Sequence, residues 1–151
     1  MPHQYTANRT VEFHETDMAG IVHFSNFFRW MESVEHAFFR SLGQTLHTQE
    51  HGTMSGWARV HASCDYRAPL KYQDEVEVRL AVREKRPSAI TYDFLFTRVA
   101  PGERATVARG SLTAVCVSRE PGDERMRAVP MPEDVARLVE IAPPELLDET
   151  D

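Results

Sequence analysis

A short stretch near the amino terminus holds the residue types that catalysis at a carbonyl group requires. Residues 16–24 read T-D-M-A-G-I-V-H-F and lead directly into a predicted helix. The first backbone N–H groups of a helix have no partner within it, so they can stabilise the oxyanion that forms when a carbonyl is attacked. The carboxylate of Asp17 could attack that carbonyl or activate a water molecule. The same pattern also fits an acid that only caps the helix, which is the commoner role.

A long amphipathic helix is predicted directly after this stretch, over about residues 25–42. Gly43 is well placed to end it, and Ser25 or Asn26 could cap its start. The apolar sector is wide, which indicates a helix that the rest of the fold largely encloses. A narrow polar stripe runs along the other side and consists of Arg29, Ser33, His36 and Arg40.

The rest of the chain is predicted to form strands, because apolar residues there alternate with a period of about 2. A first strand precedes the helix, at about residues 6–14. Four more follow a polar loop at 44–53, and a short helix closes the chain; these elements cover about residues 56–66, 75–85, 89–99, 105–118 and 132–141. The order indicates an α+β fold in which a long helix packs on a mainly antiparallel five-stranded sheet. The other face of such a sheet needs cover, so we expect a dimer or a larger assembly.

Composition limits the classes of function. The length of 151 residues suits a single domain, and the net charge of −6 lies entirely after residue 132, with an acidic tail at about 143–151. Without a basic surface, nucleic-acid binding is not expected. The sequence has no long apolar run and no recognisable signal peptide, and its two cysteines are isolated from each other. We therefore predict a cytoplasmic protein without membrane contact.

Two acids of the predicted helix stand out by their position. Glu35 falls in the apolar sector and Glu32 at its edge. A carboxylate in apolar surroundings costs several kcal/mol unless it is paired or useful. We expect each acid either to form an ion pair across a subunit interface or to face a substrate.

Metal and cofactor motifs are not supported. Residues 47–51 read H-T-Q-E-H, which resembles a zinc-binding pattern, but that pattern works only on a helix and this stretch is a polar loop. There is no GxSxG, GxGxxG or P-loop motif. We therefore predict no metal site and no cofactor.

Residues 11–32 resemble the active-site region of the hotdog-fold acyl-CoA thioesterases, in particular the 4-hydroxybenzoyl-CoA thioesterase family and its YbgC-like relatives. The shared pattern is an aromatic-rich strand, then T/C-D-x-x-G, then a short apolar run into a long helix. Weaker similarity continues through residues 61–63, 74–76, 83–89 and 124–128. The resemblance therefore covers nearly the whole chain and implies a hotdog fold.

The resemblance also implies roles for individual residues. Asp17 matches the catalytic carboxylate, the backbone N–H of Phe24 matches the oxyanion donor, and Gly20 matches the turn between them. Thr16, His23 and Glu32 are expected to contact the substrate, with Glu32 at a helix position that binds a ring hydroxyl in some members. His23 could be a pocket wall or an acid–base assistant.

A basic turn is the expected binding site for coenzyme A. In the family this turn contacts the phosphates of the substrate, and Lys85, Arg86 and Ser88 are suitable donors here. A charged hairpin is otherwise simply a solvated edge.

The resemblance predicts an acyl-CoA thioesterase that yields a free acid and coenzyme A. The fold implies a homodimer as the minimal active unit, further assembled as a dimer of dimers into a homotetramer. Two other functions stay open, a hydratase or dehydratase of acyl thioesters and a noncatalytic acyl-CoA-binding module.

Overall fold

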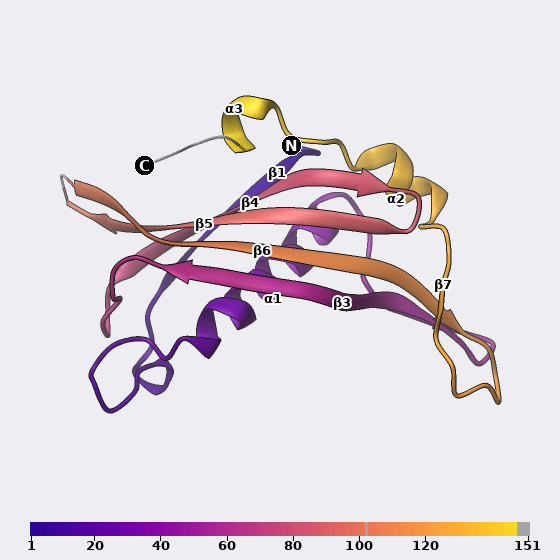
Figure 1. The fold of residues 1–151 in the computed structure, drawn as a ribbon, viewed down its shortest axis with the longest axis horizontal. Coiled ribbons are helices and arrows are strands. Elements are labelled where there is room, and N and C mark those ends of the chain that lie inside the picture. The colour runs from indigo at the N-terminus through magenta and orange to yellow at the C-terminus, as the bar shows by residue number, and fades with distance from the viewer. Residues whose placement is uncertain (102, 148–151) are drawn as a thin grey trace.

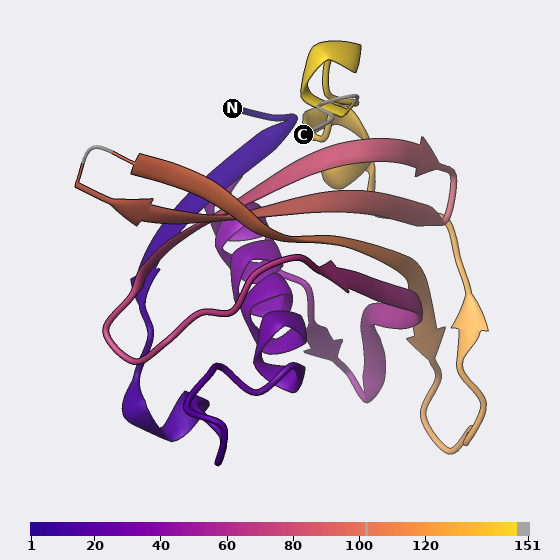
Figure 2. The same cartoon turned by 60° about the vertical axis from the view of Figure 1, so that its left-hand side comes forward.

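A single antiparallel sheet wraps around one long helix (Figures 1 and 2). The computed structural model describes residues 1–101 and 103–147. Within them the strand order is β1-β4-β5-β6-β3-β2, and β7 pairs with β6. The strands are β1 (Gln4–Thr10), β2 (Thr48–Glu50), β3 (Thr53–Tyr66), β4 (Glu75–Arg86), β5 (Ala89–Ala100), β6 (Glu103–Arg119) and β7 (Arg127–Ala128). The helices are the 3-10 helix η1 (Phe13–Glu15), α1 (Ser25–Ser41), α2 (Glu133–Leu138) and α3 (Pro144–Leu147).

Helix α1 is the predicted central helix and matches it to within one residue. Its polar stripe is exposed and its apolar side is buried against the sheet. Gly43 adopts a φ of 73° just after the helix, and its N–H bonds to the Arg40 carbonyl, while the N–H of Gln44 bonds to Phe39. These two bonds form a Schellman motif, so the predicted stop is confirmed. The predicted cap is wrong, because the N-cap residue is Phe24 rather than Ser25 or Asn26.

The helix lies close to the sheet at Gly110 of β6. A Cβ atom at this position would lie 2.1 Å from the Cε atom of Met31 and 3.2 Å from the Ser63 carbonyl oxygen. A glycine therefore lets the Met31 side chain pack directly on the backbone of the sheet. A larger residue at position 110 would have to displace the Met31 side chain.

The core lies between α1 and the concave face of the sheet. Tyr92, Phe94 and Phe96 of β5 share the buried face, as their alternation predicts. The first strand is shorter than predicted, because η1 follows it and turns the chain. The predicted polar loop at 44–53 contains the short strand β2, which pairs only with residues 53–55 of β3.

Strand β3 has an open edge. One side pairs with β6 along its length, whereas residues 56–66 meet no strand on the other side among the described residues. A β-bulge between Arg59 and His61 interrupts the pairing with β6, and Val60 at this bulge is 62% exposed. Open edges of this length are usually covered by another chain or blocked.

The carboxyl-terminal segment packs on the sheet near β4. The carbonyls of Leu146 and Leu147 in α3 accept hydrogen bonds from Arg79 and Arg83 at 3.2 and 3.1 Å. The acidic tail predicted at 143–151 thus begins in contact with the fold, and residues 148–151 lie outside the described residues. None of the described helices combines the length and the apolar character that a membrane crossing requires.

Candidate active site

Asp17 lies in a tight loop whose two ends, at Thr16 and Val22, lie side by side. Thr16 and Val22 form an isolated β-bridge, the Asp17 N–H donates to the Ile21 carbonyl, and the N–H of Gly20 donates to the Asp17 carbonyl at 3.0 Å. Gly20 has a φ of 81°, a left-handed conformation that favours glycine and allows this turn. The loop therefore presents one exposed carboxylate on a defined backbone.

The Asp17 carboxylate does not cap helix α1. Its Oδ1 atom accepts the N–H of Ala19 at 2.8 Å within the same loop. Oδ2 has no hydrogen-bond partner among the described residues and can approach a ligand or a water molecule.

The start of α1 leaves one backbone donor free. The N–H groups of Ser25, Asn26 and Phe27 bond to His23 Nδ1, the His23 carbonyl and the Phe24 carbonyl. By contrast, the N–H of Phe24 meets no acceptor in the described part of the chain. Such a donor at a helix start is suited to hold negative charge on an oxygen atom.

Asp17 and Phe24 line the same cavity, which has a volume of about 460 Å³. Its walls are mainly apolar and are formed by Asp17, Ile21, Val22, Phe24, Phe27, Tyr66, Arg67, Ala68, Pro69 and Leu70. The carboxylate is thus neither walled off nor remote from the helix start. A carboxylate and a free N–H beside an apolar hollow can attack and polarise a carbonyl carbon bound there.

Tyr66 secures the backbone of Phe24 from strand β3. Its hydroxyl donates to the Phe24 carbonyl at 3.0 Å. Burial and the neighbouring Cys64 raise the pKa of Tyr66 to about 12, so the hydroxyl keeps its proton at neutral pH. Burial likewise raises the pKa of Cys64 to about 11, so this thiol is not a nucleophile at neutral pH. Both Cys64 and Cys116 are free thiols.

Thr16 and His23 turn their side chains to neighbours within the chain. The Thr16 hydroxyl donates to the Phe13 carbonyl at 2.7 Å. His23 Nδ1 accepts from the Ser25 N–H at 3.3 Å and lies 2.7 Å from the Ser25 hydroxyl. The ring also stacks on Phe24, with centroids 4.6 Å apart. Because Nδ1 is an acceptor here, the neutral ring carries its proton on Nε2.

Sequence reasoning missed Glu15, which is the best-connected acid near the loop. It is 5% exposed, and its carboxylate accepts hydrogen bonds from Trp30, Arg9 and the Glu12 N–H. These partners lie three to fifteen residues away, so no local periodicity indicates them. The only available signal was the position of this acid directly before the T-D-x-x-G motif.

Glu32 does not reach the Asp17 cavity within one protomer. It is exposed and lines a separate cavity of about 290 Å³, together with Leu46, His36, His47, Gly56, Trp57 and Arg59. The guanidinium of Arg59 lies 4.0 Å from Glu32 and 2.5 Å from Glu35. The expected interface ion pair of Glu35 is therefore an ion pair within the protomer.

The three expected phosphate donors differ in their contacts. The Lys85 ammonium donates to the carbonyls of Ala136 and Val139 at 2.7 and 2.9 Å, which places it at the carboxyl end of α2. Arg86 is half exposed and lies 3.4 Å from Glu84. The Ser88 carbonyl accepts the N–H of Cys116. Figure 1 shows their hairpin at the end of the sheet opposite the Asp17 loop.

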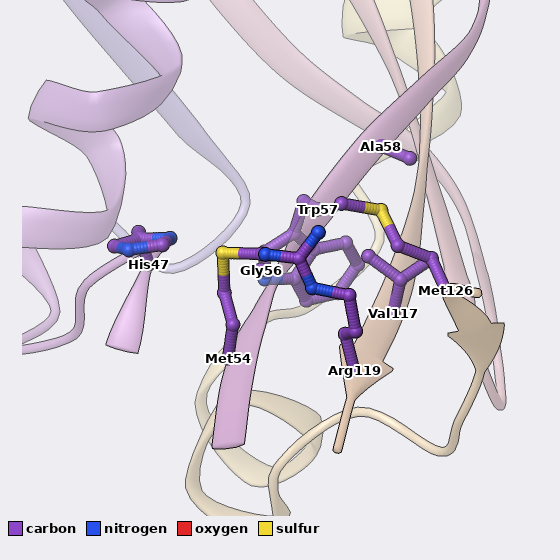
Figure 3. A pocket seen from close by; sticks show the side chains of 8 residues that line it. All are labelled: His47, Met54, Gly56, Trp57, Ala58, Val117, Arg119 and Met126. Atoms are coloured by element: carbon purple, nitrogen blue, oxygen red, sulfur yellow. The ribbon is translucent and has the colours of Figure 1, made fainter. Parts of the chain in front are cut away.

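A smaller hollow of about 170 Å³ adjoins the Glu32 cavity at the edge of β3 (Figure 3). Met54 and Met126 close it from two sides, and Arg119 reaches between them. It shares His47, Gly56 and Trp57 with the Glu32 cavity. Both hollows therefore lie at the end of β3 that is remote from Tyr66.

The described residues contain no group of three His, Cys, Asp or Glu side chains that could hold a metal ion. The H-T-Q-E-H stretch contributes to strand β2 and a turn rather than to a helix. Its histidines are thus not arranged as in the zinc proteases.

Residues 11–139 match the thioesterase-like superfamily. The chain belongs to this superfamily. A 4-hydroxybenzoyl-CoA thioesterase of Pseudomonas sp. (strain CBS-3) is 26% identical over 142 residues, which cover 91% of this chain and 99% of the relative. A 1,4-dihydroxy-2-naphthoyl-CoA hydrolase of Synechococcus sp. (strain RCC307) is 30% identical over 141 residues, covering 86% and 96%.

Solved structures agree with this family membership. A mutant of 4-hydroxybenzoyl-CoA thioesterase in complex with 4-hydroxybenzoyl-CoA superposes with a TM-score of 0.79 at 23% identity, covering 91% of this chain and 99% of that structure. The chain therefore has the hotdog fold that its sequence predicts. As a member of the thioesterase-like superfamily it is a thioester hydrolase.

Proposed function

We propose that this protein hydrolyses an acyl-CoA to a free acid and coenzyme A, with Asp17 as the catalytic carboxylate. One observation carries the proposal: Asp17 and Phe24, whose N–H has no acceptor in the described part of the chain, line one cavity. The relatives that are named for aroyl-CoA hydrolysis support coenzyme A as the leaving group. No further cofactor takes part in the proposed reaction.

The reaction begins with a thioester carbonyl whose oxygen accepts the Phe24 N–H. An oxyanion-hole donor of this kind is worth about 3–4 kcal/mol of transition-state stabilisation. Asp17 Oδ2 then either attacks the carbonyl carbon or takes a proton from an attacking water. In the first case the C–S bond breaks to give an anhydride, which water hydrolyses; in the second, water adds directly. Both routes consume one water and release the thiol and the acid.

The active unit we propose is a homodimer formed through the open edge of β3. Antiparallel pairing of two such edges places the Tyr66 end of one strand beside the Gly56 end of the other. The Asp17 cavity of one protomer then adjoins the Glu32 cavity of the other. Glu32 would thereby reach the acyl group although it is remote from Asp17 in its own chain. Two such dimers would associate through the faces of the sheets.

The same pairing explains how the basic hairpin could bind coenzyme A. Ser88 bonds to Cys116, which pairs with Trp57 at the Gly56 end of β3. The hairpin thus lies where the Asp17 cavity of the other protomer would open. We assign the phosphate contacts to Arg86 and Ser88, and a structural role to Lys85.

Replacing Asp17 by Asn tests the proposal. The amide oxygen can still accept the Ala19 N–H, so the loop should keep its conformation, while the nucleophile or base is lost. We expect kcat to fall by about 10²–10⁴-fold with an unchanged thermal midpoint. Thiol release from a panel of aromatic and short-chain acyl-CoAs measures this and identifies the acyl group.

The exposed acid Glu140 provides the control, and Glu140→Gln should keep full activity. An Asp17→Asn variant within a few-fold of the wild-type rate would overturn the assignment of Asp17. Loss of the conjugated double bond of an enoyl-CoA without thiol release would instead indicate a hydratase. Tight acyl-CoA binding without turnover of any substrate would indicate a binding module.

A further inference from the structure

We infer that Glu15 is a positioning residue for hydrolysis: it holds the Asp17 carboxylate and the Phe24 N–H in one fixed geometry. The inference rests on the proposed function of these two groups. Glu15 does not line the Asp17 cavity, so it acts through the loop rather than on the substrate.

The Glu15 side chain is tied to three separate segments. Oε2 accepts from Trp30 Nε1 at 2.7 Å and from Arg9 Nη2 at 3.0 Å, and Oε1 accepts from the Glu12 N–H at 2.8 Å. Arg9 also lies over the Trp30 ring, 5.0 Å from its centroid. One carboxylate therefore links β1, the η1 turn and the second turn of α1.

The Glu15 backbone holds both ends of the catalytic loop. Its carbonyl accepts the His23 N–H at 2.9 Å and the Asn26 side-chain amide at 2.8 Å. His23 directly precedes Phe24, and Glu15 lies two residues before Asp17. The contacts of the Glu15 side chain hold this backbone in place. They thereby also fix the distance between the Asp17 carboxylate and the Phe24 N–H.

The chemistry of these contacts requires a carboxylate. Every group that reaches the Glu15 oxygen atoms is a donor, so an amide at this position would turn its own N–H₂ towards a donor. A buried charge is costly and an apolar side chain would serve packing at least as well. We therefore attribute the acid at position 15 to its role in orienting the loop of residues 16–24.

Glu15→Gln is the informative substitution, because it keeps the size of the side chain and removes the charge. Small displacements of reacting groups can cost about 10²-fold in rate, so we expect kcat to fall by about 10–100-fold while KM changes little. Glu15→Asp, which retains the charge on a shorter side chain, should recover part of the loss. Glu140→Gln, at an exposed acid between α2 and α3 that contacts neither Glu15 nor the loop of residues 16–24, is the control and should be neutral.

Combining substitutions separates positioning from simple loss of stability. In the Asp17→Asn background there is no carboxylate left to position, so Glu15→Gln should lower kcat by a much smaller factor than in the wild type. An equal factor in both backgrounds would show that Glu15 affects only the folded fraction. A folded Glu15→Gln variant with wild-type kcat would also overturn the inference.

A structure of the Glu15→Gln variant supplies a readout that does not depend on activity. We expect residues 16–24 to shift relative to α1, and an unchanged loop would refute the positioning role. If the wild type releases no thiol from any acyl-CoA, the proposed function fails, whereas the loop structure still decides the role of Glu15.

Discussion

Glu35 is the most deeply buried acid of the described residues and was expected to face a partner or a substrate. Its Oε1 accepts a hydrogen bond from Arg59, and the buried Tyr92 hydroxyl lies beside the carboxylate. Burial is the main cause that raises the pKa of Glu35 to about 7, the Arg59 charge and the Tyr92 hydroxyl lower it, and Glu32 adds a small increase. The carboxyl group therefore changes its protonation near neutral pH inside the core.

This pKa predicts how stability depends on pH. The folded pKa of about 7 exceeds the ordinary value of 4.5, so folding favours the protonated form. The contribution of Glu35 to the free energy of unfolding is complete below about pH 4.5 and is lost as pH rises through 7, up to about 3 kcal/mol. Urea unfolding between pH 5 and 8 should show this decline in the wild type and not in Glu35→Gln. Glu50→Gln, at an exposed acid of β2, should retain the wild-type slope, and parallel curves for the wild type and Glu35→Gln would contradict the prediction.

At the scale of elements, the β4–β5 hairpin combines two tasks within adjacent residues. Lys85 bonds to the last carbonyls of α2 and holds this short helix on the sheet, whereas Arg86 is half exposed at the turn. Alternation along a strand sends neighbouring side chains to opposite faces, which explains how consecutive cations acquire different roles.

Substituting these two cations should separate the roles. Lys85→Met removes both hydrogen bonds to α2, so we expect about 1–2 kcal/mol less stability with little change in KM. Arg86→Gln should leave stability unchanged and raise KM for acyl-CoA about tenfold. A pantetheine thioester without the nucleotide should show no effect of Arg86→Gln. An Arg86→Gln variant with unchanged KM for acyl-CoA would remove the hairpin from the binding site.

For the whole molecule, the open edge of β3 is the surface through which we propose that two chains pair. The Asp17 cavity lies at one end of this strand, and the Glu32 cavity and the basic hairpin lie at the other. Within one protomer, the proposed reacting groups and the remaining groups expected to bind substrate are therefore far apart. In the proposed dimer, pairing two edges would bring complementary groups of the two chains together.

Val60 provides a test of this assembly. Its side chain is largely exposed at the bulge, so Val60→Asp should cost the isolated protomer little. In a paired edge the same change places like charges close together, and we expect monomers with strongly reduced turnover. Light scattering after size exclusion reports the mass, and Val60→Thr is the shape-matched control. A wild-type monomer that hydrolyses acyl-CoA at full rate would refute the dimer proposal.

Some of this protein could be read from the sequence by itself. The central helix, the order of the long strands and the T-D-x-x-G loop are local features, because each depends on residue spacing within a few turns or strand repeats. The glycine stop at Gly43 follows from the same local rules. The elements predicted an α+β fold, and the resemblance of residues 11–32 to the hotdog-fold acyl-CoA thioesterases then implied the hotdog fold and the family.

Only the tertiary structure decided which charged groups meet. The bonds of Glu15 to Arg9 and Trp30, of Glu35 to Arg59 and of Lys85 to α2 join residues that are 6 to 54 positions apart. Such contacts depend on strand register, which shifts at the bulge beside Val60. They also depend on how closely the helix approaches the sheet, as at Gly110. Periodicity within one element carries no information about these relations, so the partners of buried charges become visible only when the elements are packed.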